Sequence, residues 1–293
     1  MNDYAPGYGR GLRLLEQAHL RSLDREPLEA HARELATTAY LGNSVSLCRV
    51  LGRYHMYVDT TDVGFAAHLL MGGFWETWLT IFMARRLMPG MRVADVGANH
   101  GYYTLLMGDM VGPQGRVAAV EPNAKIADLL RKSVAINGFA DRTQVFEQAA
   151  CELDDESIWM RLPIGEPKNG HRVAGPDAPT MPGDTVVQAR AGRLATMLGG
   201  WDRLDFAKID VEGAEETAIA GLMPILERDK PDLVVEFNAP RCAAPREFID
   251  RLESLYGRIR HIEGDSEAHD TPRETLFDAS RIDDWLLFLS VRD

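Results

Sequence analysis

The amino-acid sequence predicts an α/β fold whose mostly parallel sheet is covered by helices on both faces. From residue 91 onward, strand-like and helix-like segments alternate regularly. A short apolar strand at residues 93–97 leads through a glycine turn into a helix at residues 102–110. The next strand, residues 116–120, ends at an acidic residue, Glu121. Open α/β sheets bind ligands at such strand ends, so this order also predicts where a site lies.

The region before the sheet predicts an extension of helices and a hairpin. Leucines and alanines at helical spacing predict two helices within residues 12–40. Residues 43–59 alternate between apolar and polar side chains, as two paired strands do. Two more helices are expected at residues 62–71 and 73–88. We therefore expect residues 1–90 to form an N-terminal cap or dimer surface.

Residues 91–293 are expected to form the core of the protein. Its further elements are predicted as helix 124–137, strand 143–149, strand 204–209, helix 214–222, strand 231–237, helix 245–256, strand 258–262 and a last, antiparallel strand 285–290, with a long loop at 263–284. Residues 151–185 are rich in proline and glycine and interrupt this alternation. They predict either a flap on the substrate side or an irregular solvated insertion.

Composition limits the classes of protein to which the chain can belong. The formal net charge is −12, and residues 1–90 contain as many basic as acidic residues, so the acidic excess lies in residues 91–293. Broad nucleic-acid binding needs a basic face and is not expected. Three widely spaced cysteines predict reduced thiols, neither a disulfide framework nor a metal knuckle. Without a signal-like N-terminus or a membrane-length apolar run, a cytoplasmic protein is expected.

The glycine turn indicates a ligand that contains ribose but no pyrophosphate. Gly97 and Gly101 let the backbone approach a ligand closely, and their spacing differs from the dinucleotide pattern G-x-G-x-x-G. Glu121 lies where a carboxylate accepts hydrogen bonds from both ribose hydroxyls. Gln148, at the end of the third strand, is placed to meet adenine or is a plain strand-end amide. S-adenosylmethionine is the cofactor that fits these features.

Acidic residues at two further strand ends are candidates for the chemistry. Asp210 and Glu212 follow the strand 204–209, and Lys208 lies on the same side of that strand as Asp210. Glu236 closes the following strand. One of the three carboxylates is expected to be the general base for an alcohol acceptor, with Lys208 tuning it. Alternatively, the oxygens of Asp210, Glu236 and Asn238 hold a divalent metal that activates the acceptor hydroxyl.

Taken together, these stretches resemble the FkbM-type methyltransferases. The resemblance covers residues 56–237 and is carried by Asp62, Glu76, the motif DVGANHGYYT at 95–104, VEPN at 120–123, NG at 137–138 and KIDVEGAE at 208–215. It implies a class I Rossmann-like methyltransferase sheet and S-adenosylmethionine as methyl donor. It also implies O-methylation of a hydroxyl group on a natural product, a sugar or a lipid.

The resemblance also implies roles for individual residues. Cofactor binding is implied for Glu76, Asp95, Gly97, Asn99, Gly101, Glu121, Gln148 and Asp210, and Glu76 would close over the cofactor. Position alone also places Trp75 on the side of its helix that could reach the site. His100 stands where the family often has an aliphatic residue, so its role stays open, as does that of His171 in the insertion.

Other functions remain open from the sequence alone. N-methylation of an amine and metal-assisted O-methylation are alternatives to base-catalysed O-methylation. A nicotinamide-dependent oxidoreductase is disfavoured by the glycine spacing, and an inactive adenosine-binding module by the acidic strand ends. The expected partner is a small-molecule hydroxyl acceptor, with no nucleic acid and no membrane, and a homodimer through the N-terminal region.

Overall fold

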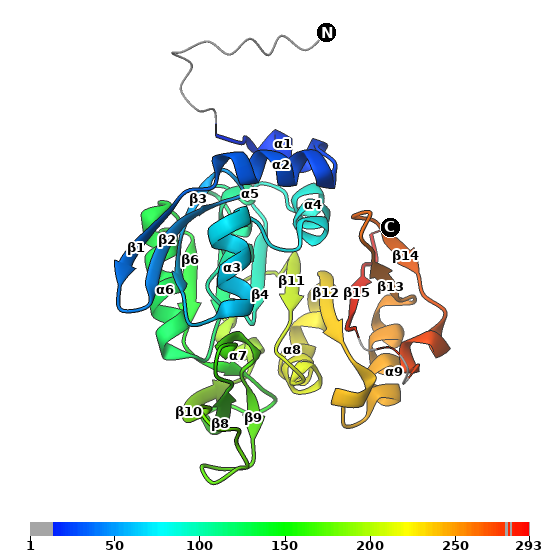
Figure 1. The fold of residues 1–293 in the computed structure, drawn as a ribbon. Coiled ribbons are helices and arrows are strands. Elements are labelled where there is room, and N and C mark those ends of the chain that lie inside the picture. Colours follow the sequence, from blue (N-terminus) through cyan, green and yellow to red (C-terminus); the bar gives the residue numbers. More distant parts are fainter. Residues whose placement is uncertain (1–13, 279–280, 282, 293) are drawn as a thin grey trace, which may run out of the picture.

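A computed structural model describes residues 14–278, 281 and 283–292 and contains the expected α/β sheet (Figure 1). Among these residues the main sheet has eight strands, in the spatial order β14 (Ala268–Asp270), β13 (Arg260–Ile262), β15 (Trp285–Leu289), β12 (Asp232–Phe237), β11 (Phe206–Ile209), β4 (Arg92–Val96), β5 (Arg116–Val120) and β6 (Thr143–Phe146). Strands β12, β11, β4, β5 and β6 are parallel, and β15 is antiparallel to β12. The predicted α/β fold, with a mostly parallel sheet and an antiparallel last strand, is confirmed.

Alternating side chains of the strands point into two separate hydrophobic layers. Val93 faces the layer built from α4 (Thr77–Arg86) and α5 (Tyr102–Met110), whereas its neighbour Ala94 faces the layer of α8 (Glu215–Asp229) and α9 (Pro245–Tyr256). Helix α6 (Ala124–Ile136) and the short α7 (Leu194–Met197) complete the helical cover. Because both faces are buried, the strands consist almost entirely of apolar residues, and polar groups collect at their ends.

The N-terminal region contains the two predicted helices and the predicted hairpin. Its elements are α1 (Gln17–Ser22), α2 (Arg25–Leu35), β1 (Thr38–Gly42), β2 (Val45–Val50), β3 (Tyr54–Asp59) and α3 (Val63–Gly72). The expectation of helix up to residue 40 is wrong, because Thr38–Gly42 pairs with β2 as a third strand. All its residues but the last are exposed, so no buried face produced a recognisable strand pattern.

Side chains of α6 attach the hairpin to the core. Ser133 Oγ accepts a hydrogen bond from Tyr57 N (2.9 Å), while Asn137 accepts from His55 N (3.0 Å) and donates to His55 O (2.6 Å). These bonds satisfy the free edge of β3 and cover it. The division into an extension of residues 1–90 and a core of residues 91–293 stays a proposal, and residues 1–13 lie outside the described part of the extension.

The insertion forms a second, smaller sheet. Its strands β7 (Ala149–Ala150), β8 (Glu156–Leu162), β9 (His171–Val173) and β10 (Thr185–Gly192) lie in the order β7-β10-β8-β9, and a turn of 3-10 helix, η1 (Pro167–Asn169), joins β8 to β9. An irregular solvated segment, one of the two alternatives, is therefore wrong for residues 151–185. Figure 1 shows this sheet beyond the carboxyl ends of the main strands.

Several boundaries differ from the sequence prediction; the expected strand 143–149, for example, divides into β6 of the main sheet and β7 of the small sheet. Helix α8 runs on to Asp229 because Pro224 lies on its exposed side, where water can satisfy the freed carbonyl. The expected loop 263–284 contains β14 and the 3-10 turn η3 (Arg273–Phe277), and a further 3-10 turn, η2 (Ala239–Arg241), follows β12. Within the described residues, no helix is both long and apolar enough to cross a membrane.

Candidate active site

A cavity of about 550 Å³ opens at the carboxyl ends of β4, β5, β11 and β12, under the small sheet of the insertion. Its wall includes most of the site residues predicted from the sequence: Glu76, Gly97, Asn99, Glu121, Gln148, Asp210, Glu212 and Glu236. The predicted residues Asp95, Gly101 and Lys208 lie outside the lining. The volume lies in the usual range of small-molecule sites.

The glycine turn brings the ends of β4 and β11 into direct contact. Gly97 has φ +77°, and a Cβ built on it would lie 1.7 Å from the carbonyl oxygen of Asp210. Gly101 is the N-cap of α5 with φ +98°, and a Cβ there would lie 2.3 Å from Leu130 Cδ1. Both positions require glycine. Gly97 thereby contributes to the cavity wall, whereas Gly101 sets the start of the helix behind it.

Glu121 is fixed at the end of β5 by two backbone amides. Its carboxylate accepts hydrogen bonds from Asn99 N (3.0 Å) and Asn123 N (2.8 Å). Burial, only partly offset by these two bonds, raises the pKa of Glu121 to about 7. The carboxylate therefore lines the cavity in a fixed orientation, on the same wall as Gln148. This geometry suits an acceptor for the hydroxyls of a ribose.

Behind the cavity wall, Lys208 is buried beside two carboxylates. Its Nζ lies 2.9 Å from Asp210 Oδ2 and 5.0 Å from the centre of the Tyr103 ring. Asp95 is 1% exposed and accepts a hydrogen bond from Thr104 Oγ1 (2.6 Å). Despite its burial, Lys208 has a raised pKa because Asp210 and Asp95 stabilise its charge. Lys208 therefore orients Asp210 from behind, and Asp95 adds a second carboxylate near the lysine.

Three carboxylates at the ends of β11 and β12, those of Asp210, Glu212 and Glu236, face the cavity together. Arg241 in η2 contacts Glu212 (3.3 Å) and Glu236 (3.6 Å), and it also forms an ion pair with Asp284. Burial, and then the charge of Asp210, raise the pKa of Glu212 to about 7. The same two causes raise the pKa of Glu236 well above its usual range. Glu236 therefore keeps its proton to a higher pH than an ordinary glutamate does, while Glu212 titrates near neutral pH.

Glu76 closes the cavity from the opposite side, at the start of α4. It accepts a hydrogen bond from Tyr103 Oη (2.7 Å), and burial raises its pKa. Glu76, Asn99 and Glu212 all have left-handed backbone, with φ of 35°, 50° and 56°. Non-glycine residues rarely adopt this conformation because it is strained, and residues that do adopt it are frequent at functional sites. The neighbouring Trp75 also lines the cavity, as expected.

His100 and His171, whose roles the sequence left open, lie outside the main cavity. His100 is fully buried, stacks on Phe65 and accepts a hydrogen bond from Asp59 N (3.1 Å) through Nε2. Burial lowers its pKa to about 4, so it is neutral and ties α3 and β3 to the glycine turn. His171 begins β9 and lines a smaller adjoining hollow.

Several cavity residues were missed by sequence reasoning. Arg241, Asp284, Lys168 and Arg172 all line the cavity. The first two lie just past β12 and just before β15, where sheet topology alone brings them together. Lys168 and Arg172 lie within the insertion. The alternation Ile158-x-Met160-x-Leu162 there could have predicted a strand with one face on the cavity.

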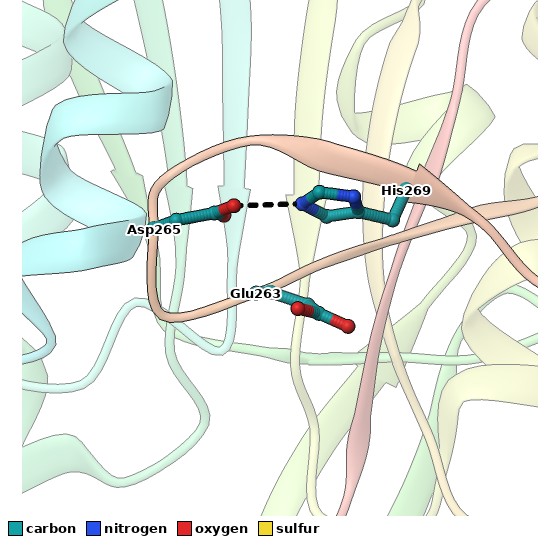
Figure 2. A group of neighbouring side chains, drawn as sticks. All are labelled: Glu263, Asp265 and His269. Atoms are coloured by element: carbon teal, nitrogen blue, oxygen red, sulfur yellow. Dashed lines mark hydrogen bonds and ion pairs between the residues drawn. The ribbon is translucent and has the colours of Figure 1, made fainter.

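Two of the three side chains suggested as metal ligands have cationic partners. Asp210 pairs with Lys208 and Glu236 lies 3.6 Å from Arg241, whereas Asn238 donates through Nδ2 to Asp284 (2.7 Å) and its buried Oδ1 has no hydrogen-bond partner among the described residues. Among the described residues, the cluster whose geometry would suit a metal ion is Glu263, Asp265 and His269, at the turn between β13 and β14 (Figure 2). Figure 2 shows Asp265 paired with His269, and none of the three lines the cavity.

Comparison with known proteins gives matches to methyltransferases. The model of the methyltransferase FkbM domain matches residues 95–262, more than half of the chain. A protein-L-isoaspartate O-methyltransferase from Aeropyrum pernix is 34% identical over 112 residues, which are 38% of this chain and 40% of that protein. The chain spans about two fifths of the length of such curated relatives.

Two solved structures align with much of the chain. Methyltransferase FkbM from Methylobacillus flagellatus KT gives a TM-score of 0.42 at 15% identity, over 73% of this chain and 53% of that one. An O-methyltransferase from Bacillus cereus in complex with SAH gives a TM-score of 0.43 at 14% identity, over 78% of this chain and 87% of that one. The family model covers most of the sheet and the strand ends around the cavity. The chain belongs to the FkbM methyltransferase family.

Proposed function

We propose that this protein transfers the methyl group of S-adenosylmethionine to a hydroxyl oxygen of a small molecule, such as a natural product, a sugar or a lipid. The observation that supports this most is Glu212, a carboxylate on the cavity wall whose pKa of about 7 suits a general base at neutral pH. The bound cofactor supplies an activated methyl group for in-line displacement. The protein supplies alignment, which accounts for much of the rate of such reactions.

Cofactor binding is assigned to the wall formed by β4, β5 and the segment after β6. Glu121 would accept hydrogen bonds from the ribose hydroxyls, and Gln148 would face the adenine. Gly97 and Asn99 would line the methionine part, with Glu76 closing over it. The fit rests on a narrow turn that admits no Cβ at Gly97 and on a fixed carboxylate at Glu121.

The acceptor is assigned to the ends of β11 and β12. Glu212 would take the hydroxyl proton as the oxygen attacks the methyl carbon. Glu236, whose pKa is raised well above its usual range, would donate a hydrogen bond to the acceptor in its protonated form. Asp210, held by Lys208 at 2.9 Å, would orient the reacting groups. The insertion would cover the acceptor as a flap, because Ile158, Met160 and Leu162 line the cavity from above.

An amine and a carboxylate are rival acceptors. The group of carboxylates around Asp210 would also bind an ammonium, so N-methylation belongs in the same test. The A. pernix relative is named as an O-methyltransferase of protein L-isoaspartate, and a carboxylate acceptor is tested beside the hydroxyls. S-adenosylhomocysteine release should be measured with matched alcohols, amines and carboxylic acids.

The decisive variant is Glu212→Gln, with Glu227→Gln as the control. Glu227 is exposed on α8 and lies outside the cavity lining. We expect Glu212→Gln to bind S-adenosylhomocysteine normally, to lose about 100-fold or more in kcat on a hydroxyl acceptor, and to lose the fall in rate below pH 7. Normal turnover in Glu212→Gln, or turnover of amines alone, would contradict the proposed reaction.

A further inference from the structure

The cavity continues outward past the carboxylates of β11 and β12. An adjoining hollow of about 450 Å³ lies between the insertion and the start of α8. The two spaces share Asn169, Arg172, Glu212, Ala214 and Arg241 in their walls. Because Glu212 stands at their junction, an acceptor whose hydroxyl reaches Glu212 extends into the outer hollow. The side chains of that hollow therefore contact the rest of the acceptor.

Strand pairing directs Arg172 into this space. Arg172 on β9 is paired directly with Met160 on β8, and directly paired residues point to the same face of a sheet. Met160 lines the cavity, and so does Arg172. In the described part of the chain no carboxylate forms an ion pair with Arg172. Although the chain has a net charge of −12, this cation on the cavity wall has no ion pair in that part of the chain.

The other cations of the wall already have partners. Arg241 contacts Glu212 and Glu236 and forms an ion pair with Asp284. Lys168 Nζ lies 4.7 Å from the centre of the Trp75 ring, next to Glu76 on the cofactor side. Arg172 therefore differs from Arg241 in having no ion-pair partner among the described residues, and from Lys168 in lining both spaces.

We infer that the acceptor carries an anionic group, a carboxylate or a phosphate, which Arg172 binds while the hydroxyl faces Glu212. The inference rests on the proposed function and specifies its substrate class. A guanidinium has planar, paired donors that match both oxyanions and stays charged at all relevant pH values. Arg172 is a binding residue in this account, and its loss weakens the acceptor without changing cofactor binding.

The test uses sugars that differ only in charge. Glucose, glucuronate and glucose 6-phosphate are titrated by calorimetry into the full-length protein saturated with S-adenosylhomocysteine, at constant ionic strength. We expect at least one charged sugar to bind about tenfold or more tightly than glucose, since a charged hydrogen bond contributes roughly that much. The two charged sugars distinguish a carboxylate site from a phosphate site.

Variants separate Arg172 from general charge effects. Arg172→Gln should remove the preference for the charged sugar, Arg172→Lys should keep part of it, and both should bind S-adenosylhomocysteine like the wild type. The control is Arg190→Gln, an exposed arginine on β10 of the same small sheet that lines neither space, and it should keep the full preference.

Each outcome decides the inference. Equal affinity for charged and neutral sugars, no binding of either charged sugar, or an unchanged preference in Arg172→Gln would overturn it and leave the proposed methyl transfer intact. Failure of the wild type to bind S-adenosylhomocysteine would instead overturn the proposed function, and the inference with it.

Discussion

At the scale of single residues, Glu121 has the most direct role in cofactor binding. Replacing it by alanine removes the acceptor for Asn99 N, Asn123 N and the ribose hydroxyls together. Charged hydrogen bonds of this kind contribute about 1.5–3 kcal/mol each, so S-adenosylhomocysteine affinity should fall by about 10- to 100-fold or more. Calorimetry with S-adenosylhomocysteine measures this affinity. Glu147→Ala is the control, because Glu147 forms an exposed ion pair with Arg131 outside the cavity.

Lys208 is expected to matter for stability more than for chemistry. Lys208 is 2% exposed, and Lys208→Met would leave the charges of Asp210 and Asp95 without their cation. Removing one partner of a buried ion pair typically costs about 3–5 kcal/mol. The exposed pair Lys132–Asp128 on α6 supplies the control, since Lys132→Met should cost less than about 1 kcal/mol. Urea denaturation curves give the free energy of unfolding of both variants. A similar decrease in Lys208→Met and Lys132→Met would contradict this account.

At the scale of elements, the turn from β4 to α5 fixes the distance between two strand ends. A Cβ at Gly97 would lie 1.7 Å from the Asp210 carbonyl oxygen, so Gly97→Ala must separate β4 from β11. We expect loss of S-adenosylhomocysteine binding and a large drop in stability. Gly112→Ala is the matched control, because Gly112 also has positive φ (+64°) but has open space around it. Gly112→Ala should lower the free energy of unfolding only by its backbone strain, about 1–2 kcal/mol.

The insertion is held over the cavity by few contacts. Val63 N donates to Gly165 O (2.8 Å), and Lys168 lies over Trp75. If the insertion closes on the cofactor, S-adenosylhomocysteine should slow trypsin cleavage after Lys168 and Arg172. Digestion followed by mass spectrometry measures this, with NAD as the ligand control. Equal cleavage with and without S-adenosylhomocysteine would mean that the insertion does not respond to the cofactor.

Sequence patterns predicted the main sheet well and the insertion poorly, for a physical reason. Strands such as Arg116–Val120 are buried on both faces, so their apolar composition alone identifies them. The strands of the insertion are only partly buried and are separated by prolines and glycines, which masked the alternation around Met160. The acidic strand ends were visible locally. Arg241 and Asp284 were not, because only the fold brings them beside Glu236.

At the scale of the whole molecule, the acidic cavity makes stability depend on pH. Glu121 and Glu212 have folded pKa values of about 7, above the ordinary 4.5, so the folded state keeps protons that the unfolded chain releases. Their contribution to stability is full below pH 4.5 and is lost as pH rises through 7. His100, whose folded pKa of about 4 has the opposite effect, is half protonated in the unfolded chain at pH 6.5 and loses that proton at higher pH, so its opposing contribution above pH 6.5 is small.

Between pH 6.5 and 8.5 the carboxyls therefore dominate. The free energy of unfolding of the ligand-free protein should be higher at pH 6.5 than at pH 8.5, and Glu212→Gln should reduce that difference. Chemical denaturation at the two pH values measures it. A protein that is more stable at pH 8.5 would show that these carboxyls are not protonated as described.

The homodimer through the N-terminal region stays a prediction. The outer strand β1 exposes Tyr40 and Leu41, and an exposed edge strand can pair with a second copy. Leu41→Lys should then shift the protein towards the monomer in sedimentation experiments. A wild-type monomer at all accessible concentrations would contradict the dimer.

The central claim is that one cavity at the strand ends holds the nucleoside and exposes its activated carbon to an acceptor. The most direct measurement is a crystal structure of the protein with S-adenosylhomocysteine. We predict ribose hydroxyls on Glu121, adenine beside Gln148 and the sulfur facing Glu212. A nucleoside bound elsewhere, or Glu121 turned away from it, would contradict the account.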